Sequence, residues 1–464
     1  MKIEPKRCSG GNKLKVLFAV HYSAEYHEYI DISIVSALLK ANGYKVKAVQ
    51  ATYAALKAEL AEPSIVICSV WSSAAIDYYA ALLRGLKKDY LFFSALCGSY
   101  PTMAPELIEN EGIDGVCIGE PVFALVELIE KLSLNGSITG VLNWWVKSDG
   151  NIYKNPQREL IEDLDILPFA DIGLLKDTPL FNPMIKHIIA SRGCPFGCSY
   201  CRNSSYKYSD HARILRNRSV ENVIEEILRA KKDHSLKFIV FNDAIFGLNI
   251  EWLRGFSESY GKNVHLPFYC NVRADLITEK SVSYLSHAGC RSVSVGIETS
   301  DELSRNKVLG KNISNAQIEK ALIVLKRAGI RIRATNIVGI SCAPITADIE
   351  TVRFNRRCGV DFAEAFPLAY LPNTGLSKKT PAIVKKYPEE LMNLKYLFGV
   401  AVEFPFLISV MQFLIRLPLR RVYWWIGMFW REYCYSMRIY HLGIGYFFQR
   451  IRNCRKHIKI YSTM

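Results

Sequence analysis

The stretch Lys186-His-Ile-Ile-Ala190-Ser-Arg-Gly-Cys194-Pro-Phe-Gly-Cys198-Ser-Tyr-Cys201 joins a short apolar run to a turn that contains three cysteines. The run predicts a β-strand, and the Gly and Pro residues after it predict a loop. In α/β barrels, the chemistry takes place in loops at the carboxyl ends of the strands. The stretch therefore predicts a barrel strand that places three thiols in one functional loop.

Apolar runs alternate with helical stretches from this loop to about residue 380. Five further strands are expected, at Lys237 to Phe241, His265 to Asn271, Ser292 to Gly296, Arg331 to Val338 and Phe362 to Ala369. Six strands joined by helices fit a partial barrel better than another open sheet, although periodicity does not settle whether the barrel closes. We expect residues 184–380 to form a partial (β/α)6 barrel.

Residues 1–150 show a similar alternation of short strands and helices. The strands are expected at Leu14 to Val20, Tyr44 to Val49, Ser64 to Val70, Tyr90 to Ser94 and Gly115 to Ile118. This βαβ rhythm is typical of a doubly wound, Rossmann-like parallel sheet. Prolines recur in residues 151–183, so we expect a linker there.

The alternation stops in residues 381–464, which are aromatic and basic. Trp424, Trp425 and Trp430 stand among arginines such as Arg420. The longest uncharged stretch, Phe404 to Ile415, is shorter than the ~20 residues needed to cross a bilayer. The region predicts a helical extension that either lies on a lipid surface or caps the barrel mouth.

The chain has 464 residues, enough for about three domains, and a formal net charge of +15. This charge suits nucleic acid, phosphate-bearing ligands or an anionic membrane, and composition alone does not choose among them. The start, Met1 to Lys13, lacks the apolar core of a signal peptide. We therefore expect a cytoplasmic protein whose 13 cysteines are reduced.

One cysteine group, Cys194, Cys198 and Cys201, is spaced like a set of metal ligands. Three thiolates can bind three irons of a [4Fe-4S] cluster and leave the fourth iron open to another ligand. A zinc site requires a fourth Cys or His nearby. A structural metal knuckle remains the alternative at this stage.

The C-x₃-C-x₂-C spacing, with Tyr200 before the last cysteine, resembles the radical S-adenosylmethionine superfamily. The resemblance implies that the open iron binds S-adenosylmethionine and that an electron from the cluster releases a 5′-deoxyadenosyl radical. It extends to later strand ends and implies cofactor contacts for Tyr200, Asn242, Asp243, Arg273, Glu298 and Gly339. Asp243 is alternatively a helix N-cap, and Arg273 and Glu298 are alternatively partners in structural ion pairs.

Two segments of the first domain, Gly98-Ser-Tyr-Pro101 and Asp114-Gly-Val-Cys-Ile-Gly119-Glu120, resemble the cobalamin-binding domain fused to radical enzymes. The resemblance implies cobalamin contacts for Ser69, Ser72, Ser73, Gly98, Ser99, Gly119 and Glu120. The D-x-H-x-x-G motif that supplies a cobalt ligand in some relatives reads Ala19-Val-His21-Tyr-Ser-Ala24, without the Asp and Gly. His21 is thus either a cobalt ligand or an ordinary loop histidine.

These resemblances predict a cobalamin-dependent radical methyltransferase that methylates an unactivated carbon of a small-molecule or lipid-like substrate. An external electron donor of the flavodoxin or ferredoxin type is implied, and the catalytic side chains remain unassigned. The first alternative is a cyclisation or rearrangement with the same cofactors. The second is a basic iron–sulfur protein that binds membrane or nucleic acid without radical catalysis. We expect no nucleic-acid partner, and we expect the C-terminal region to be the place of any peripheral contact with the inner face of a membrane.

Overall fold

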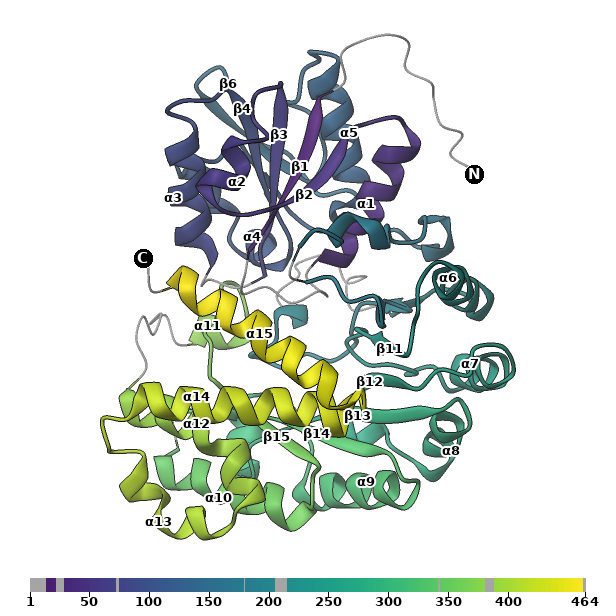
Figure 1. The fold of residues 1–464 in the computed structure, drawn as a ribbon, viewed down its shortest axis with the longest axis vertical. Helices are drawn as coiled ribbons and strands as arrows, with labels where there is room; N and C mark the ends of the chain where they lie inside the picture. Colours follow the sequence, from purple (N-terminus) through teal and green to yellow (C-terminus); the bar gives the residue numbers. More distant parts are fainter. Residues whose placement is uncertain are drawn as a thin grey trace. The chain divides into compact units, whose positions relative to one another are not determined.

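The computed structural model describes residues 14–21, 29–71, 75–178, 180–204, 215–340, 343–379 and 388–461, with the backbone alone for residues 453–461. The chain divides into two compact units, drawn in Figure 1. Among the described residues, those up to 182 belong to unit 1 and those from 183 onward belong to unit 2. Each unit is described by itself below.

Unit 1 is built on a seven-stranded sheet in the order β2-β1-β3-β4-β5-β6-β7. The strands are β1 (Lys15–Val20), β2 (Val46–Gln50), β3 (Ser64–Ser69), β4 (Phe92–Cys97), β5 (Gly115–Cys117), β6 (Trp144–Ser148) and β7 (Asn151–Lys154). The helices are α1 (Ile30–Ala41), α2 (Tyr53–Lys57), α3 (Ile76–Leu86), α4 (Ser99–Met103) and α5 (Pro121–Ser133). The first five strands run parallel, as the sequence predicts.

Helices cover both faces of this sheet, with α1 packed on α5 and α2 packed on α3 (Figure 1). The central strands β1 and β3 are therefore almost wholly buried, which explains their unbroken apolar sequences. The carboxyl ends of the parallel strands meet at one edge. The strand order reverses between β1 and β3, and ligands of open α/β sheets bind at such a switch point.

An antiparallel hairpin, β6 and β7, extends the sheet beyond the expected strands. Asp149 and Gly150 join its strands, and both have positive φ angles, 50° and 76°. An Asp-Gly pair is a strong signal for such a turn. The sheet of unit 1 consequently runs on to Lys154, four residues into the stretch expected to be a linker.

Unit 2 contains a six-stranded parallel sheet whose strands follow one another in chain order. They are β8 (Ile185–Ile188), β11 (Phe238–Phe241), β12 (Phe268–Val272), β13 (Cys290–Glu298), β14 (Arg331–Val338) and β15 (Phe362–Pro367). The helices that alternate with them are α6 (Val220–Asp233), α7 (Ile250–Asn263), α8 (Glu279–His287), α9 (Asn315–Arg327) and α10 (Ile345–Cys358) (Figure 1). This sequential order confirms the partial barrel. A short antiparallel pair, β9 (Ser191–Arg192) with β10 (Arg216–Asn217), was not expected.

The C-terminal region of unit 2 is helical. Its helices are α11 (Gly375–Lys379), α12 (Glu389–Glu403), α13 (Phe406–Leu414), α14 (Arg420–Tyr433) and α15 (Gly443–Tyr461), with a π-helical turn at Cys434–Ile439 between the last two. α12 packs against both β15 and α14. Across the described residues, every helix is too short or too polar to cross a bilayer.

The buried part of this region fills the amino end of the partial barrel. Cys434, Ile439 and Tyr446 share a buried cluster with the residues that begin the strands, among them Ile185 and Phe238. The hydroxyl of Ser292, at the start of β13, donates to the carbonyl of Ile439 over 2.9 Å. The expected cap therefore lies at the amino ends of the strands, not at the mouth formed by their carboxyl ends. The periodicity of a tail does not indicate which end it will cover.

Candidate functional site

The cysteine loop follows β8 at the carboxyl edge of the partial barrel. Cys198 is buried, Cys194 and Cys201 are half-buried, and all three are free thiols. Burial raises the pKa of the Cys201 thiol to about 11, with smaller increases from Cys198 and Cys194 opposed by the Asn203 N–H and the Arg202 charge. Burial also raises the pKa of Cys194, although the charge of Arg273 opposes the shift. Removing these protons is favourable only with a strong positive partner, such as a metal ion.

The donor chemistry of this loop fits an iron–sulfur cluster better than zinc. Three sulfur donors lie within eight residues of one turn. Within the part of the chain that the structure describes, no three His, Cys, Asp or Glu side chains are arranged as a metal-binding group. The same finding means that the three cysteine side chains share a loop without pointing at a common centre.

Ser199, inside the cysteine motif, fixes the loop to its surroundings. Its backbone N–H donates to the carbonyl of Leu309 over 2.9 Å, and its hydroxyl donates to the carbonyl of Val308 over 2.6 Å. The N–H of Leu376 donates back to the Ser199 carbonyl over 2.8 Å. The connection between β13 and α9 and the start of α11 therefore hold the middle of the motif.

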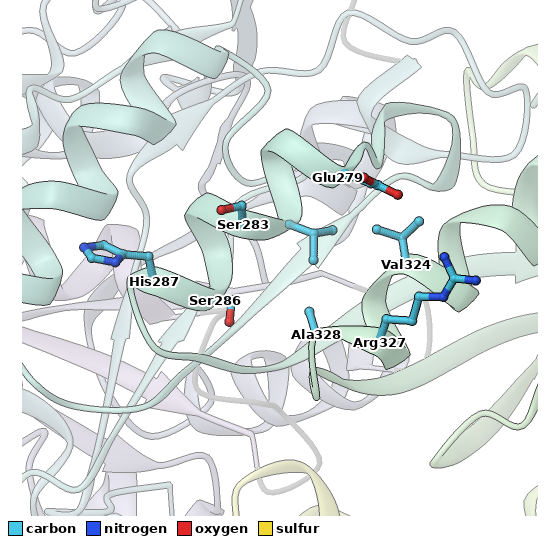
Figure 2. A pocket seen from close by; sticks show the side chains of 8 residues that line it. Glu279, Ser283, Ser286, His287, Val324, Arg327 and Ala328 are labelled. Carbon is cyan, nitrogen blue, oxygen red and sulfur yellow. The ribbon is translucent and has the colours of Figure 1, made fainter.

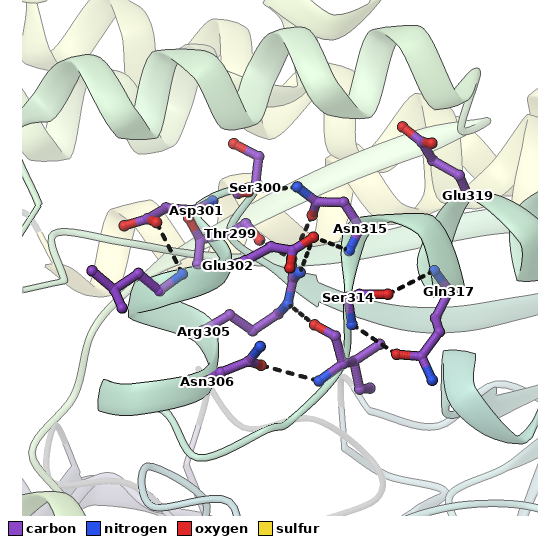
Figure 3. A network of polar contacts seen from close by, with 12 residues as sticks. Thr299, Ser300, Asp301, Glu302, Arg305, Asn306, Ser314, Asn315, Gln317 and Glu319 are labelled. Carbon is purple, nitrogen blue, oxygen red and sulfur yellow. Dashed lines mark hydrogen bonds and ion pairs between the residues drawn. The ribbon is translucent and has the colours of Figure 1, made fainter.

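Arg305 stabilises that connection from inside (Figure 3). Its side chain is fully buried, and its guanidinium donates to the carbonyls of Thr299 and Ile313 and to Asn315 Oδ1. The Nε and Nη1 groups are paired in this way, while Nη2 lies 3.9 Å from the Glu302 carboxylate. The hydrogen bonds to Thr299 and Ile313 tie both ends of the segment together. Arg305 thus shapes the surface on which Ser199 docks.

Arg273 lies directly against the cysteine loop. Its Nη1 is 3.5 Å from Cys198 Sγ, its guanidinium stacks on the Phe196 ring at 3.9 Å, and its Nη2 donates to the Lys311 carbonyl over 2.5 Å. It also forms an ion pair with Asp275 at 2.8 Å. The structure therefore shows the ion pair and, in addition, a positive charge placed beside a thiol.

Glu298 is buried at the end of β13 with a φ of +66°, which is rare for a residue with a side chain. Its Oε1 pairs with Lys311 Nζ at 2.5 Å and accepts a hydrogen bond from the Tyr200 hydroxyl at 2.8 Å. Lys311 Nζ also donates to the carbonyl of Gly296 over 2.7 Å. Sequence reasoning missed Lys311, whose apolar neighbours Leu309 and Ile313 are the one signal that it lies inside.

Three other expected contacts lie at neighbouring strand ends. Asp243, after β11, accepts hydrogen bonds from the Ala190 N–H and the Ser191 hydroxyl. It is not a helix N-cap, because Asn249 caps α7 instead. Burial raises the pKa of Asp243 to about 6.

Asn242 lies 3.1 Å from His187 Nδ1, which places its amide in the interior of the barrel. Gly339, after β14, has a φ of +76°, and its N–H donates to the Asp348 carboxylate over 3.0 Å. The expected residues thus lie at the carboxyl ends of β11, β12, β13 and β14, and Arg273 and Glu298 directly contact residues of the cysteine loop.

In unit 1, four expected residues lie at the carboxyl edge of the sheet. His21 follows β1 and is buried beside the rings of Tyr78 and Tyr79, at centroid distances of 4.9 and 5.6 Å. Ser69 ends β3, and Gly98 and Ser99 follow β4. A Cβ at Gly98, whose φ is +108°, would lie 2.6 Å from the Val70 carbonyl oxygen. The edge needs glycine there because two turns approach closely.

The remaining expected residues of unit 1 have other surroundings. Gly119 has a φ of +87° and donates its N–H to Thr102 Oγ1 over 3.0 Å. Glu120 accepts the N–H of Ile161 over 3.2 Å and so holds the chain that leaves the sheet. Ser72 and Ser73 lie outside the described residues.

An open groove on the outer helical layer of unit 2 lies between α8 and α9 (Figure 2). The side chains that line it include Glu279, Ser283, Ser286, His287, Val324, Arg327 and Ala328. It is remote in the fold from the strand ends that carry the cysteine loop, because it lies between the outer helices. We do not assign chemistry to it.

Comparison with known proteins places this geometry in context. Residues 188–341 match the family described as the Radical SAM superfamily. A protein of Pyrococcus horikoshii named as an uncharacterized methyltransferase is 27% identical over 327 residues, which cover 68% of this chain and 69% of that protein. The anaerobic magnesium-protoporphyrin IX monomethyl ester cyclase of Rubrivivax gelatinosus is 27% identical over 382 residues, which cover 78% of this chain and 66% of the cyclase.

Solved structures share the fold. The radical S-adenosylmethionine methyltransferase TsrM from Kitasatospora setae, solved with cobalamin and a [4Fe-4S] cluster, has a TM-score of 0.65 at 16% identity, covering 81% of this chain and 80% of TsrM. The cobalamin-dependent radical enzyme OxsB has a TM-score of 0.59 at 19% identity, covering 74% of this chain and 52% of OxsB. Both matches extend beyond a single domain and agree with the expected combination of a Rossmann-like sheet and a partial barrel.

Proposed function

We propose that this chain, an enzyme that carries a radical SAM domain, is a cobalamin-dependent methyltransferase that methylates an unactivated carbon. The observation that carries the proposal is the loop of three free thiols at the carboxyl end of the first barrel strand. Three sulfur donors leave one corner of a [4Fe-4S] cluster for S-adenosylmethionine. The methyltransferase name of the Pyrococcus horikoshii relative supports the reaction class.

The residues around the loop fit the binding of S-adenosylmethionine. The cluster supplies the electron that cleaves S-adenosylmethionine, and the corrinoid carries the methyl group that is transferred. Cys194, Cys198 and Cys201 would hold the cluster, and the Arg273 guanidinium lies 3.5 Å from Cys198 Sγ. Glu298 offers carboxylate oxygens to ribose hydroxyls, while Tyr200 and Lys311 hold that carboxylate in place.

Asn242, Asp243 and Gly339 complete the proposed cofactor site. Asp243 positions the start of the cysteine loop through Ser191, and Asn242 presents its amide to the barrel interior. Gly339 provides a turn without a Cβ at the end of β14, where a Cβ would overlap Leu391. In these roles the protein binds and orients the cofactor and excludes water from it.

Cobalamin binding is proposed for the carboxyl edge of the sheet in unit 1. A broad, flat corrin needs an open edge with little side-chain bulk, and the residues gathered there are small: Ser69, Gly98, Ser99 and Gly119. Ser72, Ser73 and Glu120 complete the proposed set. His21 lies at the same edge and remains either a cobalt ligand or a packed histidine.

A non-methylating cyclisation is the second candidate. It is favoured by the similarity to the Rubrivivax gelatinosus cyclase, which has the same identity as the methyltransferase match and covers more of this chain. Both reactions would use the same cofactors. The fate of the methyl group of S-adenosylmethionine distinguishes them.

The test is anaerobic reconstitution of the full chain with iron, sulfide and cobalamin, followed by reduction with isotope-labelled S-adenosylmethionine and a metabolite extract. We expect 5′-deoxyadenosine, and labelled methyl in a product detected by mass spectrometry. 5′-Deoxyadenosine without labelled product would favour the cyclase candidate. No 5′-deoxyadenosine would overturn both and favour a basic iron–sulfur protein that binds membrane or nucleic acid.

Replacement of one cluster ligand gives the matched control. Cys194→Ser should abolish the iron-dependent absorbance and the 5′-deoxyadenosine, because two thiolates cannot hold the cluster. Cys358→Ser, at a half-buried free cysteine on α10, should change neither. Equal behaviour of the two variants would contradict the assignment of the ligands.

The partners follow from this chemistry. The substrate is a small molecule or a lipid-like molecule, and the electron comes from an external flavodoxin or ferredoxin. The proposed location is the cytoplasm, with the C-terminal region as the place of contact with the inner face of a membrane. The reduction step makes activity dependent on a low-potential donor, which is testable by replacing dithionite with reduced flavodoxin.

A further inference from the structure

The helices α13 and α14 expose a concentration of large apolar side chains. On α13 these are Phe406, Val410 and Phe413, and on α14 they are Val422, Trp425, Ile426 and Phe429. The spacing of three or four residues places each set on one helical face. Phe406 is 68% exposed and Phe429 is 52% exposed. Clusters of this kind mark interaction sites in soluble proteins.

The opposite faces of these helices are firmly packed. Asn393 on α12 donates to the carbonyl of Ile415 over 2.8 Å, and the Tyr423 hydroxyl donates to the carbonyl of Leu414 over 2.9 Å. Gly427 lies so close to the backbone of Tyr396 that a Cβ would overlap its carbonyl oxygen. The exposed apolar residues are therefore the outward face of helices already anchored to the barrel.

The segment from Phe404 to Arg431 carries only positive charges, while Glu403 and Glu432 flank it and Glu390 on α12 lies beside Arg416. The sequence from Phe404 to Arg431 contains no Asp or Glu and contains Arg416, Arg420 and Arg421 near the apolar residues. Arg420 and Arg421 are exposed, and neither forms an ion pair with any residue the structure describes. Arg416 makes only an exposed pair with Glu390, at 3.6 Å.

A lipid surface with anionic headgroups matches both properties. Trp and Phe side chains suit the boundary between headgroups and acyl chains, while arginines bind the phosphates. A protein partner would account for the apolar face alone but gives no reason for the unpaired arginines Arg420 and Arg421 beside it.

We infer that the exposed faces of α13 and α14, together with Arg416, Arg420 and Arg421, bind an anionic lipid surface. Trp425 and Phe429 enter the headgroup boundary, and the two unpaired arginines contact lipid phosphates. The inference builds on the membrane contact proposed above by adding the surface and the class of lipid, and it does not require the radical chemistry.

The test is co-sedimentation of the full chain with vesicles of phosphatidylglycerol and phosphatidylcholine, compared with vesicles of phosphatidylcholine alone. We expect binding to the anionic vesicles, weakened by salt. The double variant Arg420→Gln, Arg421→Gln should bind about 30-fold more weakly, because each arginine near an anionic surface contributes about fivefold. Phe429→Ser should bind about 10-fold more weakly, because the ring is no longer buried in lipid.

Matched controls distinguish binding through this surface from non-specific binding to lipid. Arg327→Gln on α9 and Leu91→Ser in unit 1 change an exposed arginine and an exposed leucine elsewhere, and both should leave binding unchanged. Thermal unfolding of every variant checks the fold, and 5′-deoxyadenosine formation without vesicles should stay at the level of the unmodified chain.

Two results would overturn the inference. One is that the unmodified chain does not bind anionic vesicles, or that both test variants bind them as tightly as the unmodified chain. The other is a concentration-dependent dimer that Phe429→Ser dissociates, which would assign the face to a second copy of the chain. Loss of 5′-deoxyadenosine in the unmodified chain would count against the proposed function alone.

Discussion

Gly296 shows how one residue prepares the candidate site. A Cβ at this position would overlap both the Glu298 carboxylate and the Lys311 ammonium group. The glycine therefore allows the carboxylate to fold back across its own strand and meet the lysine. The Gly-Ile-Glu sequence is recognisable as a motif, and the structure supplies the steric reason for its first residue.

Lys311 is the partner on which the buried Glu298 depends. Lys311→Met should lower the free energy of unfolding of unit 2 by about 3 kcal/mol, because it leaves a buried carboxylate with the Tyr200 hydroxyl alone. Chemical denaturation at neutral pH measures this loss. Lys307→Met, at an exposed lysine nearby, should cost less than about 0.5 kcal/mol.

The double variant Lys311→Met, Glu298→Gln completes the cycle. It should be more stable than Lys311→Met alone, because no carboxylate remains unpaired. Additive losses in the two single variants would show that the pair does not act as a unit.

The buried carboxyl of Asp348 makes the stability of unit 2 depend on pH. Burial raises the pKa of this carboxyl from 3.8 to about 6, although the N–H of Gly339 partly offsets the shift. The native state then binds the proton more tightly than the unfolded state, so this contribution to stability is complete below about pH 4 and is lost as the pH rises through 6. The loss is up to about 3 kcal/mol.

Asp348→Asn removes the titration. Its stability relative to the unmodified chain should therefore rise between pH 4 and pH 7 by up to about 3 kcal/mol. Denaturation curves across this range measure the difference, and a difference independent of pH would refute the burial argument.

Motif spacing predicted that the three cysteines share one loop and that Arg273, Glu298 and Tyr200 lie near it. It did not predict Lys311, because a single lysine in a connection has no pattern of its own. Nor did it predict that the Asp243 carboxylate would accept hydrogen bonds from the Ala190 N–H and the Ser191 hydroxyl. Such contacts join residues far apart in sequence, and only the packed strands define them.

The packing of α14 on α12 depends on backbone approach at Gly427. Gly427→Ala should destabilise unit 2 by about 2 kcal/mol, because the new methyl group would meet the Tyr396 carbonyl and force the helices apart. Gly445→Ala on α15 is the matched control, since nothing lies within 4 Å of its Cβ position.

Gly445→Ala should stabilise its helix by about 0.5 to 1 kcal/mol, because alanine restricts the unfolded chain. Thermal unfolding should show a lower melting temperature for Gly427→Ala and a higher one for Gly445→Ala. Shifts of the same sign would show that helix propensity, not the close approach, decides the outcome.

At the scale of elements, apolar periodicity located all six barrel strands and the parallel strands of unit 1. It missed the hairpin of β6 and β7, although the Asp149-Gly150 turn was visible in the sequence. It also ended β4 at Ser94, whereas the strand continues through Ala95-Leu-Cys97. Buried strands without alternation give no clear end point, because both faces are apolar.

For the whole molecule, the division into two units predicts that cofactors can be lost separately. Gly98→Ala should weaken cobalamin binding at least about tenfold, since the new Cβ would lie 2.6 Å from the Val70 carbonyl oxygen and distort the proposed edge. The iron content per chain should not change, because the cysteines belong to unit 2.

Gly140→Ala provides the control in unit 1, since its Cβ position has no neighbour within 4 Å. Absorbance titration with cobalamin and iron analysis measure both quantities. Simultaneous loss of iron and cobalamin in Gly98→Ala would contradict independent sites.

The sequence predicted the parallel sheet of unit 1 and the partial barrel of unit 2. It left open whether the aromatic tail would lie on a lipid surface or cap the barrel mouth. In the structure one part of the tail packs on the barrel and another part is exposed. Trp430 and Tyr435 pack on the barrel, while Trp425 and Phe429 are exposed. Composition describes the whole segment, but the division between its faces is set by the barrel surface it meets.

The seal formed by Cys434, Ile439 and Tyr446 at the amino end of the strands has a consequence for biosynthesis. The strand β8 that it covers is translated some 250 residues earlier, and closing so long a loop is slow. During translation the barrel interior therefore stays exposed to water until this late segment is made. Ribosome-bound chains halted before residue 434 should accordingly be cut readily by protease within the strands. Complete chains of 464 residues, tethered to the ribosome by an added C-terminal linker that spans the exit tunnel, should resist.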